Sequence, residues 1–93
     1  MEEGKRVIIT VLGYDKIGII ANISRILADT RNNILDISQT ILQGFFTMVM
    51  VVDMAQSTVD IAELRRLLAE KGREMEMEIT VQHEDIFKFM HRV

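Results

Sequence analysis

The chain has 93 residues, 48% of them hydrophobic, and contains no Cys, Pro or Trp. This length allows one small domain of marginal stability, so a partner that covers further apolar surface would matter to it. The absence of Cys excludes disulfides and thiolate sites, and the net charge of −3 disfavours nucleic acid and anionic membranes as partners. The N-terminus is acidic where a signal peptide is basic, and the longest apolar run, residues 48–52, is too short to span a membrane. We therefore expect a soluble, cytoplasmic protein.

The first two elements are a strand and a helix. Residues 5–13 are β-branched and apolar on both alternating sets of positions, which is typical of a central strand. Residues 18–32 carry apolar side chains at helical spacing, with polar side chains opposite them. The pair Asn32 and Asn33 suits a left-handed residue at the end of this helix.

A hairpin follows the helix. Residues 34–43 and 45–54 form two strand-like runs of matched length that meet at Gln43 and Gly44, which predicts an antiparallel pair. The first of these runs contains one acid, no Lys and no Pro, so it would make a long and poorly protected edge strand. We therefore expect two copies of the chain to join along this strand.

The second half of the chain predicts a helix, a strand and a short tail helix. Ser57 or Thr58 is expected to cap the helix, since Ser57 with Asp60 three residues later approximates a capping box, and Gly72 is its expected end. Residues 74–82 alternate between apolar and polar side chains, which indicates a strand. Residues 84–93 place apolar side chains at helical spacing, and this amphipathic tail could cover the remaining face of the sheet.

This order of elements predicts an α+β fold, the ferredoxin-like βαββαβ sandwich. Right-handed crossovers would give a four-stranded antiparallel sheet with two helices on one face, the first and third strands lying in the centre. We expect one domain over residues 5–82, followed by a helical extension over residues 83–93.

The turn between the first strand and the first helix, residues 13–20, is the first candidate site. Gly18 would let a ligand approach the helix start, where free N–H groups favour a carboxylate or phosphate, and Asp15 could accept a bond from an ammonium group. The local pattern also fits, and more often means, an ordinary N-cap at Asp15 and an ordinary turn glycine. A helix end contributes only about 0.3–2 kcal/mol to anion binding, whereas millimolar affinity needs about 4 kcal/mol. A second chain would have to complete such a site.

The histidines and acids near the C-terminus are a second candidate, for a metal. His83, Glu84, Asp85 and His91 are of metal-ligating types, but His83 and His91 are too far apart to meet on one helix face. We interpret them as capping and packing groups of the tail, and expect neither a metal nor another cofactor.

Four stretches carry a family pattern: residues 13–20 (GYDKIGII), 32–38 (NNILDIS), 44–54 (GFFTMVMVVDM) and 83–93 (HEDIFKFMHRV). Together they resemble the ACT domain, the small ferredoxin-like regulatory module of amino-acid-metabolism enzymes. The resemblance covers about residues 5–82. The last stretch is similar to short stand-alone ACT proteins that are grouped with the glycine-cleavage regulator type.

The resemblance implies an amino acid bound between two subunits. The loop before the first helix of one chain and the start of the second strand of the other chain would form the site. Carried over to this sequence, the ligand-binding residues are Asp15, Gly18, Ile19, Ile20, Asn33 and Ile34. Ile17 stands where the family loop commonly has Pro.

Three functions remain open. The first is a non-catalytic regulatory homodimer that senses a small molecule such as an amino acid and alters the activity of a protein partner. The second is a structural or protein-interaction dimer without a small ligand. The third is an acylphosphatase-like hydrolase, which we disfavour because the first loop offers Tyr14, Asp15 and Lys16 instead of the arginine that would cradle a phosphate.

Overall fold

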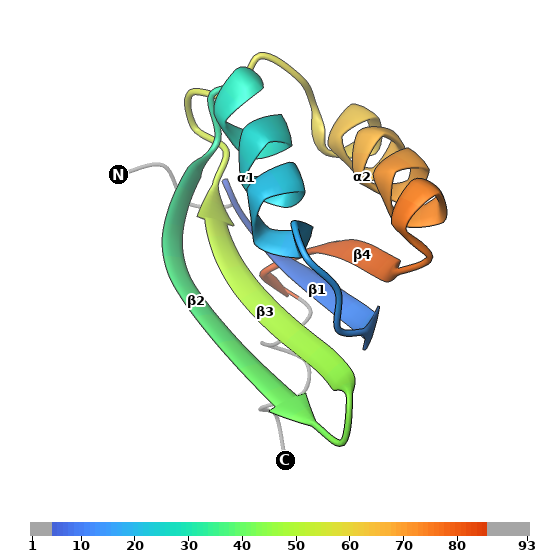
Figure 1. Ribbon diagram of the computed structural model, residues 1–93. Helices are drawn as coiled ribbons and strands as arrows, with labels where there is room; N and C mark the ends of the chain where they lie inside the picture. The colour runs from blue at the N-terminus through green and yellow to red at the C-terminus, as the bar shows by residue number, and fades with distance from the viewer. Residues whose placement is uncertain (1–4, 86–93) are drawn as a thin grey trace.

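A four-stranded antiparallel sheet with both helices on one face makes up the computed structural model, which describes residues 5–85 (Figure 1). The elements are β1 (Arg6–Tyr14), α1 (Ile19–Asp29), β2 (Asn33–Leu42), β3 (Phe45–Asp53), α2 (Ile61–Met75) and β4 (Glu78–His83). The strand order β2-β3-β1-β4 confirms the predicted ferredoxin-like βαββαβ sandwich with the first and third strands in the centre. The predicted tail helix lies outside the described residues, apart from its first two positions.

The hydrophobic core lies between the sheet and the two helices. Alternate residues of β1 and β3 point toward the helices, and the helices return apolar side chains from every third or fourth position. Burial of each such side chain stabilises the fold by roughly 1.5–3 kcal/mol. The fully buried side chains include Ile9, Val11, Ile23, Leu27, Met48, Met50, Val52, Leu64 and Leu68. The methionines of β3 therefore fill the core.

α1 ends earlier than the sequence predicts. The helix stops at Asp29, and the left-handed residue is Arg31 (φ 62°), so the prediction of Asn32 and Asn33 for this role was wrong. The hydroxyl of Thr30 donates to the Ile26 carbonyl at 2.7 Å, while the Asn32 amide donates to Thr30 Oγ1 at 2.7 Å. These buried side-chain bonds turn the chain before the helix can continue.

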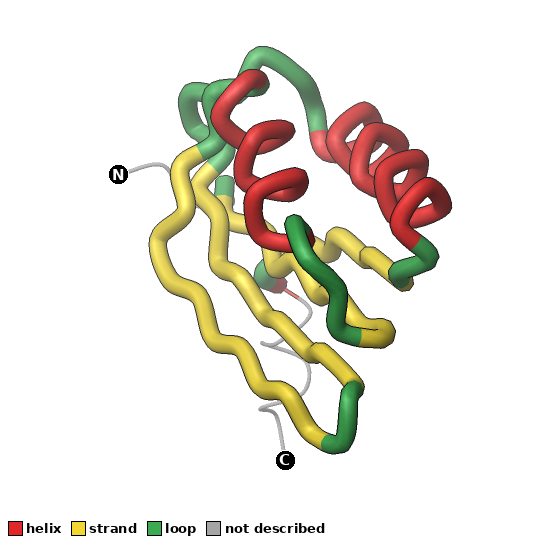
Figure 2. The backbone as a smooth tube through the Cα atoms, viewed as in Figure 1, coloured by secondary structure: helices red, strands yellow, loops and turns green. Residues whose placement is uncertain are grey.

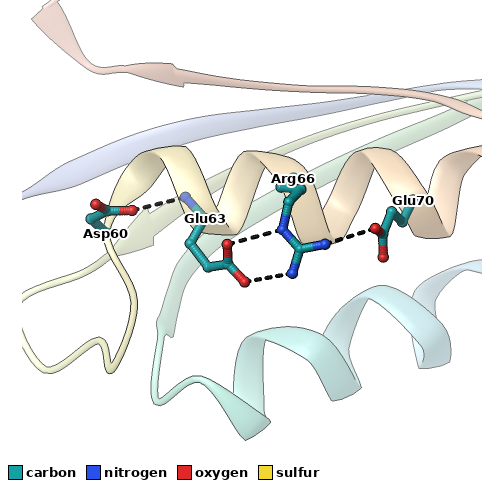
Figure 3. A network of polar contacts seen from close by, with 4 residues as sticks. All are labelled: Asp60, Glu63, Arg66 and Glu70. Carbon is teal, nitrogen blue, oxygen red and sulfur yellow. Dashed lines mark hydrogen bonds and ion pairs between the residues drawn. The ribbon is translucent and has the colours of Figure 1, made fainter.

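α2 begins at a different cap from the predicted one. Asp60 is the N-cap, and its carboxylate accepts a hydrogen bond from the Glu63 N–H at 2.8 Å (Figure 3). Of the two predicted caps, Ser57 instead donates its hydroxyl to the Val59 carbonyl at 2.8 Å, and Thr58 donates to the Thr30 carbonyl at 3.4 Å. Further along the same face, Arg66 joins Glu63 and Glu70, each at 2.7 Å (Figure 3). These exposed groups lie on the solvent side of the helix.

Gly72 lies inside α2 and does not end it. The helix continues to Met75, and Glu76 (φ 59°) is the C-cap, so β4 starts at Glu78 and not at residue 74. A Cβ atom on Gly72 would lie 2.7 Å from the Met77 carbonyl oxygen. Glycine is present here because the helix and the chain entering β4 approach each other closely.

The β2–β3 hairpin turns at Gln43 and Gly44, as predicted. Their φ angles of 52° and 85° belong to a turn whose twist matches that of the paired strands. β2 is the outer strand beside β3, and almost all of its side chains are exposed. One irregularity interrupts the pairing: the register skips Leu35 between Ile34 and Asp36. Among residues 5–85, no helix is both long and apolar enough to cross a membrane.

Candidate functional site

A backbone hydrogen bond fixes the corner between β1 and α1, residues 15–18. The N–H of Asp15 donates to the Gly44 carbonyl at 2.8 Å, which fixes the corner against the hairpin turn. Gly18 (φ 91°) is the N-cap of α1 and no side chain caps this helix, so the alternative of an Asp15 N-cap was wrong. The exposed Asp15 carboxylate and the uncapped start of α1 therefore lie in the same loop.

Lys16 attaches the loop to the far end of α2. Its Nζ donates to the Met75 carbonyl at 2.5 Å and lies 3.6 Å from a carboxylate oxygen of Glu76. Both partners are at the C-terminus of α2, where the helix dipole favours a cation. Lys16 therefore positions the loop, and sequence reasoning did not identify it because 59 residues separate it from Met75.

A cavity of about 340 Å³ opens beside this loop. This volume falls at the lower end of the roughly 300–1,000 Å³ found for small-molecule sites. Four of the predicted site residues line it, together with Lys16 of the loop, Ala21 of α1 and three residues of the hairpin. The predicted ones are Asp15, Gly18, Ile19 and Ile20, and the hairpin residues are Gln39, Ile41 and Phe46.

The strand pairing explains why β2 and β3 contribute to this cavity. Gln39 lies opposite Met48, and Ile41 lies opposite Phe46, so all four side chains share the face of the sheet that carries the helices. α1 leaves this end of the face open: Phe46 is buried but Ile41 is 56% exposed. Only the alternation of residues along β2 could have predicted that Gln39 and Ile41 line this cavity. That prediction would also have required the register between β2 and β3.

The other two predicted site residues lie elsewhere in the same chain. Asn33 and Ile34 are at the opposite end of β2, paired with Asp53 and Val52 of β3. At about 3.3 Å per residue, Ile34 and Ile41 are on the order of 20 Å apart along the strand. A single chain therefore does not bring the two halves of the predicted site together.

A second cavity, of about 420 Å³, lies at the other end of β1, between Lys5, His83 and the loop before α2. The carboxylate and the two hydroxyls that line this cavity already have partners. Asp60 caps α2, Ser57 bonds within the loop, and Thr58 donates to the Thr30 carbonyl at 3.4 Å. His83 is also engaged, with its Nδ1 accepting from the Asp85 N–H at 3.1 Å. Residues 5–85 contain no group of three metal-ligating side chains, and His91 lies outside them. We therefore regard the cavity beside Gly18 as the candidate site.

Residues 5–82 match the family model of the ACT domain. A UPF0237 protein from Methanocaldococcus jannaschii is 50% identical over 88 residues, which make up 95% of this chain and 98% of that protein. A solved ACT domain protein from Streptococcus pneumoniae is 40% identical, with a TM-score of 0.77 over 88% of this chain and 92% of the other.

A more distant solved structure has the same fold inside a longer chain. It is described as a glycine cleavage system transcriptional repressor, and it superimposes with a TM-score of 0.74 at 22% identity. The match covers 84% of this chain but only 44% of the other. At this level of identity the likeness concerns the fold alone.

Proposed function

The chain belongs to the ACT domain family and to the UPF0237 proteins, and from that membership we propose that it is a non-catalytic, cytoplasmic regulatory module. It would bind a small amphoteric molecule, such as an amino acid, where two copies of the chain meet. ACT domains are typically regulatory ligand-binding modules. The single observation that carries the proposal is the cavity in which the loop around Gly18 faces Gln39 and Ile41 of the β2 edge.

The chemistry of this cavity suits an amino acid. The uncapped start of α1 offers N–H groups and the positive end of the helix dipole to a carboxylate. Asp15, which lines the same cavity, offers a carboxylate to an ammonium group. Ile20 and Ile41 supply apolar surface for a side chain. One ligand with an anionic end, a cationic end and an apolar part satisfies all three.

One chain supplies only part of the contacts that such a ligand needs. A helix end gives about 0.3–2 kcal/mol, and an exposed ion pair gives about 0–1 kcal/mol, so together they fall short of the roughly 4 kcal/mol of millimolar binding. The free edge of β2 shows where the rest would come from. Its outward surface is apolar, with Leu35, Ile37, Ile41 and Leu42 between 42% and 69% exposed.

Antiparallel pairing of two β2 edges brings one of the two missing residues, Ile34, to the cavity. Residues that face each other across two strands share a face of the sheet. Leu35 takes no part in the register of β2, so it is left out when the two strands are aligned. A two-fold axis at Ser38 then pairs residues that share a face of the sheet, and Ile34 of the partner subunit lies opposite Ile41. Asn33 of the partner subunit then lies opposite Leu42, on the face of the sheet away from the helices and therefore away from the cavity. In this pairing Ile34 of the partner subunit joins the four loop residues at the cavity, whereas Asn33 does not.

Such a ligand would act by favouring one arrangement of the two chains. A molecule that contacts both subunits stabilises the dimer geometry that it fits, and the population of that geometry rises. A protein partner that recognises this geometry would then be activated or released. The coupling is reciprocal, so binding of the protein partner would change the affinity for the ligand by the same factor.

A structural dimer without a ligand is the second candidate. The observation that favours it is the apolar β2 edge, which would join two chains whether or not the cavity is filled. In that case Ile17, which is fully exposed at 101%, would belong to a surface that contacts a protein partner.

Thermal unfolding in the presence of each of the twenty amino acids distinguishes the two functions. A ligand at a hundred times its Kd adds about 2.7 kcal/mol, which raises the Tm of a domain this size by roughly 10 °C or more. The shift should be lost in Asp15→Asn and kept in Asp29→Asn, an exposed acid at the other end of α1. If no amino acid moves the Tm, or if Asp15→Asn keeps the full shift, the proposed ligand site is wrong.

A further inference from the structure

β4 is the second edge of the sheet, and no strand within residues 5–85 pairs with its outer side. The strand contains one acid, Glu78, and neither Lys nor Pro, so it lacks the residues that usually protect an edge. Ile79, Thr80 and Val81 are β-branched, which favours strand formation. The composition of β4 therefore suits the addition of a further strand, as that of β2 does.

The outer side of β4 presents the main-chain groups of three residues. The N–H of Glu84 donates to the Arg6 carbonyl at 3.1 Å, so these two residues are a hydrogen-bonded pair, and the register continues from them along β4. In an antiparallel ladder such residues alternate with residues whose N–H and C=O point away from the partner strand. Ile79, Val81 and His83 therefore face outward, with Val81 in the middle.

Arg65 of α2 contacts the middle one of these residues. Its Nε and Nη2 both donate to the Val81 carbonyl, at 3.1 and 2.9 Å. α2 packs beside β4 whereas α1 lies nearer β2 (Figure 2). Because the Val81 carbonyl points outward, the guanidinium lies at the outer edge of the strand. The neighbouring Arg66 instead pairs with Glu63 and Glu70 of its own helix.

We propose that Arg65 closes the β4 edge to a second copy of the chain. An added strand has to bond to neighbouring outward residues, and every such set includes Val81. The Val81 carbonyl already accepts two charged hydrogen bonds, and a charged group at a strand edge blocks the approach of another strand. The strand excluded in this way is β4 of the second copy, because β4 can pair with itself. With a two-fold axis at Thr80, Glu78 lies opposite Gln82 of the partner subunit, so no like charges face each other.

The closure of β4 limits the size of the assembly. If two copies pair through β2, as the proposed function requires, an open β4 edge would let each pair add further copies, and the sheet would continue to grow. With β4 closed, pairing stops at two copies. The contact of Arg65 with the β4 edge does not itself depend on the pairing of β2.

Sedimentation of the Arg65→Met variant of the full chain tests this closure. Methionine has a helix propensity close to that of arginine but carries no donor. The average mass should rise with protein concentration to about twice that of the unmodified protein or more, because a second edge has become available. Arg66→Met removes the same charge from the neighbouring residue and should not change the mass. Thr80→Lys added to Arg65→Met should restore the original mass, since two ammonium groups would then repel each other across the paired edges.

Two results would overturn the proposal. An unchanged mass for Arg65→Met would show that Arg65 does not close the edge, and assembly that persists with Thr80→Lys would show that the variant associates through another surface. If Arg65→Met does not fold, Arg65→Gln, whose shorter side chain carries no charge, takes its place with the same expectations.

A chain that carries Ile37→Lys on β2 separates this proposal from the pairing of β2. Arg65→Met in that chain should form pairs through β4 alone, and single chains would contradict the role of Arg65. If the unmodified protein is a single chain and Arg65→Met is a pair, Arg65 closes the β4 edge and the pairing through β2 is wrong.

Discussion

Ile34 and Ile41, at opposite ends of β2, present their side chains on the same face of the sheet. They are an odd number of residues apart, so an uninterrupted strand would place them on opposite faces. The skipped Leu35 removes one position, and both side chains lie opposite buried residues of the helix-covered face, Val52 and Phe46. This irregularity is what allows the two ends of β2 to form one site when two copies pair.

Ile37→Lys should separate the two copies. Ile37 lies one position from the proposed two-fold axis and is 42% exposed, so two new ammonium groups would lie diagonally across the axis on one face, roughly 7–8 Å apart at the centre of the interface. Sedimentation at micromolar concentration should give the mass of one chain for the variant and of two for the unmodified protein. Thr80→Lys, on the opposite edge strand β4, is the matched control and should remain a dimer.

Lys16→Met should loosen the candidate site and lower stability. The change removes the charged hydrogen bond to Met75 and leaves that carbonyl without its donor, which costs about 1–2 kcal/mol for a partly exposed group. Urea unfolding measures the loss. Lys71→Met, which breaks the surface pair with Glu74, should cost less than about 0.5 kcal/mol. Equal losses would mean that Lys16 does not position the loop.

Gly72→Ala should destabilise the protein although it removes a glycine from a helix. In an exposed helix this change gains about 1 kcal/mol. Here the new Cβ would lie 2.7 Å from the backbone oxygen of Met77, which cannot move without shifting the start of β4. We expect a net loss of about 1–3 kcal/mol in chemical unfolding. A stabilised variant would show that α2 and β4 can separate at no cost.

The pair formed by Glu63 and Arg66 should give a pH-dependent contribution to stability. Hydrogen bonding to Arg66 lowers the pKa of Glu63 below its ordinary value of 4.5. The carboxylate therefore stabilises the folded state fully above that value and loses this contribution as the pH falls through the folded pKa. The Tm gap between the unmodified protein and Glu63→Gln should be present at neutral pH and should close in acid. A constant gap would contradict this assignment.

The sequence was most informative where local patterns and tertiary structure agree. Runs of apolar and β-branched residues located β1 and β3, and the pair of Gln43 and Gly44 located the hairpin turn. The residues of the turn and the family resemblance both selected the loop at Asp15 and Gly18, which lines the observed cavity.

The remaining features depend on contacts between segments distant in sequence. Gly72 has the ordinary features of a helix end, and only the approach of Met77 explains its place inside α2. Leu35 has no sequence feature that marks a skipped position, so the register that brings Gln39 into the cavity could not be foreseen. The attachment of Lys16 to Met75 likewise arises from packing of α2 beside the loop.

Disulfide formation between Ile34→Cys and Ile41→Cys tests most directly whether two copies share one site. The protein has no other Cys, and strand length keeps the two positions on the order of 20 Å apart within a chain. Under mild oxidation, a mixture of the two single variants should form a covalent dimer, while either variant alone should not. Absence of that dimer in the mixture, or equal cross-linking of one variant with itself, would contradict the pairing of β2 edges about Ser38.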